Sequence, residues 1–144
     1  MAKFRQADEG QALVEMALVL PMLLLLAFGV VAVGRVVQAQ MGVNAVAREA
    51  ARVAALAEEP GAAQARGLAA GYAAAAGYGL QNGTLRLVVN PGDMARGGRV
   101  TAQAAYAVSL GDLPLLNWAS VGVSSTHDER VDLYRSRWTV GGQP

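Results

Sequence analysis

Residues 36–57 read VVQAQMGVNAVAREAARVAALA, and their apolar side chains recur at alternating steps of three and four residues. The positions that follow this rule are Val36, Ala39, Val43, Val46, Ala50, Val53 and Ala57. The spacing places them on one face of an amphipathic helix, away from Arg48, Glu49 and Arg52. Because the side chains on this face are small, another backbone can approach closely. We therefore expect the helix to pack beneath a globular head or against another helix, and Pro60-Gly61 to stop it.

The segment before this helix carries no charge over residues 16–34, which read MALVLPMLLLLAFGVVAVG. As a helix it would be roughly 28 Å long, close to the hydrocarbon thickness of a bilayer. We therefore predict a membrane span over residues 16–34 within one continuous helix over residues 11–57. Lys3 and Arg5 precede the span, so the positive-inside bias puts the N-terminus in the cytoplasm and the remainder outside.

The composition of the 144-residue chain excludes several functional classes. Its 12 basic and 11 acidic residues leave no surplus for nucleic-acid binding. The absence of cysteine excludes disulfides and thiol-ligated zinc. His127 is the single histidine, which removes His-pair metal sites and argues against acid–base catalysis. We expect neither enzymatic activity nor a metal or cofactor, and we interpret His127-Asp128-Glu129 as a solvated strand end.

Residues 58–130 predict a small extracytoplasmic α+β head, followed by a tail over residues 131–144. The alanine-rich stretch 62–79 predicts a second helix antiparallel to the first. Gly67 and Gly71 would share its contact face, and Leu68, Tyr72 and Tyr78 would pack inward. Alternating apolar residues predict antiparallel strands over residues 84–90 and 100–110, and a third strand, with a polar end, fits residues 119–131. The predicted fold is a long N-terminal helix, a short second helix and a small antiparallel sheet.

An apolar cluster stands in the predicted loop between the second and third strands. It consists of Leu113, Leu115, Leu116 and Trp118. Such a cluster either plugs the core of the head or contacts a partner, and both interpretations stay open here.

Glu15 is the single charged residue between Gly10 and Gly34, and it lies five residues after Gly10. A carboxylate near the end of a helix in lipid costs about 2–3 kcal/mol unless it is paired. Three interpretations of the N-terminal region are open: a signal peptide cleaved after Val37-Gln38-Ala39, a plain single-pass anchor, and a prepilin-type leader. The apolar run exceeds the usual signal-peptide core of about 7–15 residues.

The stretch from Met1 to Leu26 resembles the type IV prepilin signal, in which a short polar leader and a glycine precede a glutamate and a hydrophobic helix. More specifically, the chain is similar to the TadE-like pseudopilins of tight-adherence pilus systems. The similarity rests on the QALVE start, the leucine-rich span with an early proline, Gly34-Arg35, and the run Ala47–Arg52. Met16 stands where an aromatic residue often follows the glutamate, and the extracellular part is long. Both features differ from a major pilin of these systems.

The resemblance implies that a prepilin peptidase cleaves the leader, residues 1–10, after Gly10 and frees an α-amino group on Gln11. Glu15 would then pair with that amine on a neighbouring subunit. The implied protein is a single-pass minor pilin that assembles an adhesive pilus. Its implied partners are the peptidase, other pilin subunits, the membrane platform of the pilus machine and the lipid bilayer. The alternative is a membrane-tethered or secreted extracytoplasmic binding module whose N-terminal region serves only for export or anchoring.

Overall fold

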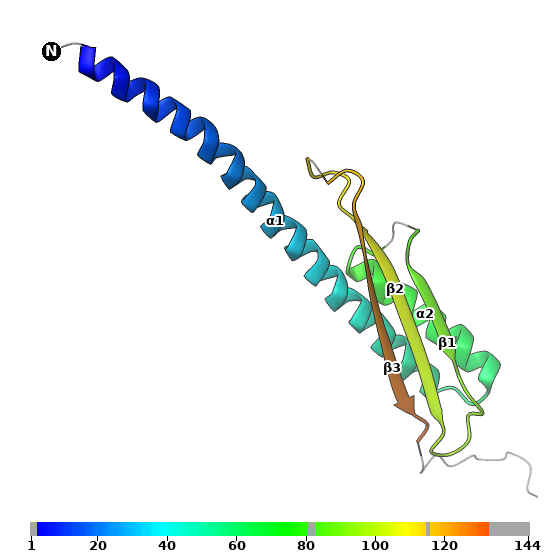
Figure 1. Ribbon diagram of the computed structural model, residues 1–144. Helices are drawn as coiled ribbons and strands as arrows, with labels where there is room; N and C mark the ends of the chain where they lie inside the picture. The colour runs from blue at the N-terminus through cyan, green and yellow to red at the C-terminus, as the bar shows by residue number, and fades with distance from the viewer. Residues whose placement is uncertain (1–2, 81–82, 115, 133–144) are drawn as a thin grey trace, which may run out of the picture.

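The computed structural model describes residues 3–80, 83–114 and 116–132. Two helices precede three strands: α1 (Lys3–Ala55), α2 (Pro60–Gly77), β1 (Arg86–Asn90), β2 (Arg99–Ser109) and β3 (Ser120–Arg130). Figure 1 shows that the C-terminal part of α1 lies against α2 and the sheet, whereas its N-terminal part extends away from them. The predicted α+β class, with a long helix, a short helix and an antiparallel sheet, is confirmed.

The sheet is antiparallel in the order β1-β2-β3. β2 pairs with β3 from Arg99↔Arg130 to Ser109↔Ser120, and the shorter β1 pairs with the middle of β2. The alternation predicted from the sequence is present in the structure. The inward residues of the first two strands are buried: Leu87, Val89, Val100, Ala102, Ala104, Tyr106 and Val108.

The apolar face predicted for residues 36–57 is the buried face of α1. Its members are buried at Ala39, Val43, Val46, Ala50 and Ala57 and half-buried at Val36 and Val53. The buried surface is wider than predicted, because Ala47, Ala51 and Ala54 are fully buried as well. α1 contacts α2 as well as β2 and β3, so it is enclosed on two adjacent sides.

α2 packs antiparallel to α1 through small residues, and those that it buries are Ala63, Gly67, Gly71 and Ala75. A Cβ added at Gly67 would lie 3.0 Å from both the carbonyl oxygen of Ala50 and the Cβ of Ala54. The predicted contact face of Gly67 and Gly71 is therefore confirmed.

The inward packing predicted for three larger residues of this region is wrong in part. Tyr72 is 50% exposed and Tyr78 is 46% exposed, while Leu68 is half-buried. Within α2 the close approach to α1 leaves room only for small residues on the contact face, so Tyr72 lies off that face. Tyr78 follows the end of α2, and its side chain lies against Gly42 of α1 while remaining partly exposed.

Candidate functional site in the N-terminal helix

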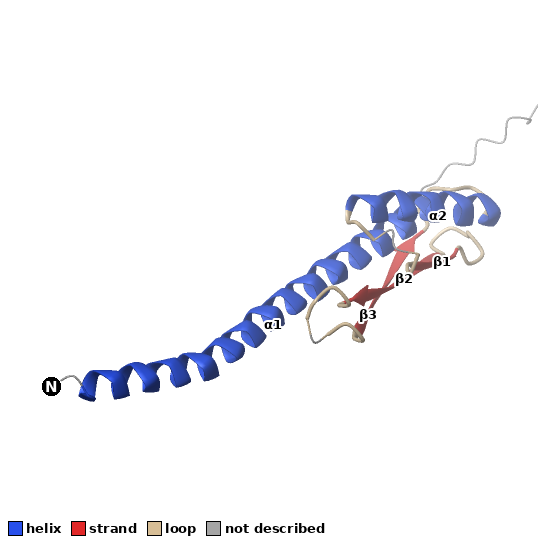
Figure 2. Cartoon of the chain, turned by 90° about the horizontal axis from the view of Figure 1, so that it is seen from above, coloured by secondary structure: helices blue, strands red, loops and turns tan. Residues whose placement is uncertain are grey.

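The N-terminal part of α1 projects from the head with its apolar surface uncovered (Figures 1 and 2). Every residue from Gly10 to Ala27 is exposed. Among the described residues, one helix is long and apolar enough to cross a membrane, and only 6% of its most apolar stretch is buried. The core helix of a soluble domain would be mostly buried. Since exposed apolar surface costs about 25 cal/mol per Å² in water, this segment needs lipid or protein around it.

Gly10, Gln11 and Glu15 all lie on this exposed end, within the continuous helix α1. A Cβ added at Gly10 would meet nothing within 4 Å, so no other described part of the chain obstructs the peptide bond to Gln11. Gln11 and Glu15 are four residues apart and therefore share one face of the helix. Side chains in a helix tilt toward its N-terminus, so the Glu15 carboxylate leans toward the backbone nitrogen of Gln11. A positive charge at that nitrogen would have a carboxylate one turn away.

Arg35 is the first charged residue after the span, and it makes an ion pair that sequence analysis missed. Its Nη1 donates a hydrogen bond to Oδ1 of Asp112 at 2.5 Å. Asp112 belongs to the β2–β3 loop, by which we mean residues 110–114 and 116–119. This hydrogen bond lowers the pKa of Asp112 and raises the pKa of Arg35. The two residues are 77 positions apart, and no local pattern links them.

The lowered pKa of Asp112 predicts a pH dependence with a definite sign. The stabilisation from this ion pair is complete above the ordinary aspartate pKa of about 3.9 and is lost as pH falls through the lower folded-state pKa. The difference in Tm between the parent chain and Asp112→Asn, measured in detergent micelles, should therefore be present at neutral pH and vanish in acid. It should be small, because both side chains are partly exposed to solvent. In an Arg35→Gln background the difference should be absent; a difference that persisted in acid would contradict the assignment.

Several titratable groups in the described part of the head form pairs with one another. His127 Nε2 lies 3.6 Å from Glu129 Oε2 on the inward side of β3. Asp128 lies on the opposite face, where its two carboxylate oxygens accept hydrogen bonds from Arg99 and Thr101. Strand alternation thus splits the His127-Asp128-Glu129 run between two faces. Within the residues that the structure describes, no three His, Cys, Asp or Glu side chains gather as a metal site would require.

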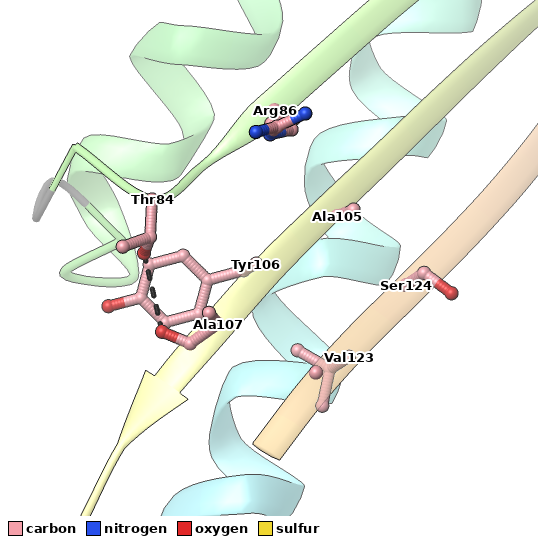
Figure 3. Close-up of a pocket in the computed structure, with 8 residues that line it drawn as sticks. Thr84, Arg86, Ala105, Tyr106, Ala107, Val123 and Ser124 are labelled. Atoms are coloured by element: carbon pink, nitrogen blue, oxygen red, sulfur yellow. Dashed lines mark hydrogen bonds between the residues drawn. The ribbon is translucent and has the colours of Figure 1, made fainter. Parts of the chain in front are cut away.

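A shallow hollow on the sheet is a second candidate site (Figure 3). Small side chains at Ala105, Ala107 and Ser124, together with Gly122, leave this space open. The Thr84 hydroxyl donates a hydrogen bond to the Ala107 carbonyl at 3.3 Å, at the rim of the hollow. Arg86 is the charged residue among the lining side chains, and no histidine or carboxylate lines the hollow with it. This lining offers no acid–base pair or activated nucleophile.

Comparison with known proteins locates the similarity in the same helix. Residues 10–52 match the family model of TadE-like proteins. No curated protein and no solved structure matches the chain. The match begins at the candidate processing site, includes Glu15 and the charge-free span, and ends in the part of α1 that packs beneath the head. Over residues 10–52 the N-terminal helix of this chain is therefore similar to that of TadE-like proteins, which fits a membrane-anchored component of a tight-adherence pilus system.

Proposed function

We propose that the chain is a minor pilin, or pseudopilin, that α1 anchors in the membrane and that takes part in assembling a tight-adherence type IV pilus. The observation that carries this proposal is the exposed apolar helix, in which Glu15 is the one charge between Gly10 and Gly34. Other pilus components are the partners that the family match implies. The proposed role is structural, without catalysis, metal or cofactor.

The charges that flank the span support an orientation for this anchor. Lys3 and Arg5 would stay on the cytoplasmic side, and the head would lie outside. The head follows the span directly, because α1 continues without interruption from the span to Ala55. In the proposed topology α1 therefore both crosses the bilayer and supplies the core of the head.

Processing would change the electrostatics of the N-terminal end. Cleavage between Gly10 and Gln11 by a prepilin peptidase would leave a positive amine on Gln11. Glu15 would then lie in the first turns of the shortened helix, where the helix dipole favours a carboxylate. An amine and a carboxylate at the edge of lipid are poorly solvated, so each gains strongly from the other. We propose that Glu15 pairs with the amine of a neighbouring pilus subunit during assembly.

The mature N-terminus tests the proposed processing. The chain purified from its native host should begin at Gln11 when its terminus is mapped by mass spectrometry. Gly10→Val should block cleavage, because a branched side chain crowds the scissile peptide. Gly29→Val is the matched control: it lies on the same helix, and a Cβ there also meets nothing within 4 Å.

Two other N-terminal residues of the purified chain would contradict the proposal. A mature chain that begins at Gln40 would indicate an ordinary signal peptide and a secreted binding module. A chain that retains Met1 would indicate a plain membrane anchor, and no free amine would then exist on Gln11.

A further inference from the structure

The β2–β3 loop is the part of the described head that reaches furthest back along α1 toward its N-terminal half (Figures 1 and 2). Its only described ion pair joins Asp112 to Arg35, the residue that ends the charge-free span. The loop is thereby fixed at the level where α1 would leave the hydrocarbon of the bilayer.

Contacts of the head continue below that level. Phe28 and Ala32 lie inside the charge-free span, yet both are half-buried and pack against the hydrophobic core of the head. They precede Val36 and Ala39 at steps of three to four residues, so they extend the same helix face. Phe28 lies about 10 Å before Arg35 along the helix axis. The head therefore overlaps the span over roughly two helical turns.

The loop has the composition of a membrane-boundary segment. Leu113 is buried and Leu116 is half-buried against the core, so part of the apolar cluster predicted from the sequence plugs the core. In contrast to these two leucines, the Trp118 side chain points away from the core: Trp118 is 82% exposed and lies in the turn between Leu116 and Ala119. Tryptophan is enriched where bilayer hydrocarbon meets headgroups, because its ring is apolar and its N–H is polar.

Several backbone amides of the loop donate hydrogen bonds to backbone carbonyls of the same loop. The amide of Leu110 donates to the carbonyl of Ala119, and the amide of Ala119 donates to Leu116. The amides of Leu116 and Leu113 donate to the carbonyls of Leu113 and Leu110 in turn. The Asp112 carboxylate is neutralised by Arg35. Internal pairing of this kind lowers the cost of moving these backbone groups away from bulk water.

We infer that the β2–β3 loop rests in the lipid headgroup layer of the membrane that α1 spans, with Trp118 as its interfacial anchor. The loop would hold the head at a fixed height and rotation relative to the bilayer, because its ion pair with Arg35 and the packing of Phe28 and Ala32 against the core of the head lie on one face of α1. The inference rests on the membrane anchoring in the proposed function. Lipid is favoured over a second copy of the chain because the loop, Arg35 and the end of the span share one level.

Single-tryptophan chains test this inference. Trp138→Phe leaves Trp118 as the sole tryptophan of the full chain. The control variant combines Trp118→Phe, Trp138→Phe and Tyr72→Trp, which moves an aromatic probe to a half-exposed position on α2, opposite the Ala50 level of α1. Each chain is reconstituted in phosphatidylcholine vesicles whose acyl chains carry bromine either near the headgroup or near the chain end. Flotation with the vesicles verifies anchoring.

The expected result is loss of most Trp118 emission with bromine near the headgroup, a smaller loss with bromine at the chain end, and shielding from aqueous iodide. The control should be quenched by iodide and insensitive to brominated lipid. Chains that float without lipid quenching of Trp118 would overturn the inference and leave the anchor intact. Trp118 could also be shielded from iodide without being quenched by brominated lipid. If that shielding depended on the ratio of protein to lipid, the inference would be overturned in favour of contact between copies of the chain. Failure to float would overturn the membrane anchoring itself.

Discussion

Glu15→Ala is expected to leave the protein in the membrane and to remove it from assembled pili. The substitution keeps the apolar span of residues 16–34 intact and even removes a charge from its edge, so insertion should not suffer. The proposed pairing with a subunit amine would be lost. Leaving one partner of a poorly solvated charge pair alone costs about 3–5 kcal/mol. That cost corresponds to roughly a hundredfold or greater loss in the association equilibrium.

The measurement compares the amount of chain in the membrane fraction with the number of pili per cell and the amount of chain in sheared pili. Glu15→Gln should behave like the alanine variant, because it keeps the size of the side chain and removes its charge. Glu49→Ala is the matched control. Glu49 is also a glutamate of α1, but it pairs with Arg52 on the surface of the head at 2.7 Å. Normal piliation with Glu15→Ala would remove the assigned role, whatever the state of the N-terminus.

Gly67→Leu is expected to destabilise the head by about 3 kcal/mol or more through overpacking. A Cβ at this position would lie 3.0 Å from the Ala50 carbonyl oxygen and the Ala54 Cβ, and 3.2 Å from Cγ1 of Val89. The Ala50 oxygen belongs to the backbone of α1 and cannot turn aside as a flexible side chain can. A leucine would therefore have to push α2 away from α1 or from β1. For a domain of this size the cost is a large share of the total stability.

Gly77→Leu is the matched control, because Gly77 ends the same helix and a Cβ there would meet nothing within 4 Å. Replacing glycine by leucine gains up to about 1 kcal/mol of helix propensity in the interior of a helix and less at its end. This gain favours Gly67→Leu, so a lower stability of Gly67→Leu than of Gly77→Leu reports the packing clash. Denaturant unfolding of the full chains in detergent micelles, followed by circular dichroism, measures that difference. Equal stability of the two variants would show that α1 and α2 do not approach as closely as the structure has them.

Periodicity in the sequence predicted the elements of this fold with good accuracy. The alternating steps of three and four residues along residues 36–57 identified the buried face of α1, and alternate apolar residues identified β1 and β2. Such patterns are readable because each depends only on the geometry of one helix or one strand. The candidate processing site at Gly10-Gln11 and the pairing role of Glu15 are what the resemblance to the prepilin signal implies, and they stay predictions. The motif can be read without the fold because Gly10, Gln11 and Glu15 are close in the chain.

The sequence did not predict in the same way which elements pack against each face of α1 and α2. For α2, hydrophobicity favoured Tyr72 and Tyr78 as inward residues, whereas the structure buries Ala63, Gly67, Gly71 and Ala75. The distance between two helices decides which side chains fit, and that distance depends on both helices together. The same holds for the additional buried alanines of α1, whose burial depends on the sheet as well as on α2.

The sequence by itself determined the long helix, its charge-free span, the lone carboxylate at the edge of that span and the strand order along the chain. These follow from local periodicity and charge. Only the tertiary structure decided that Arg35 pairs with Asp112, that the head overlaps the span as far down as Phe28, and that Trp118 faces outward while Leu113 is buried. The reason is that each of these contacts joins residues far apart in the chain, and chain folding alone brings them together.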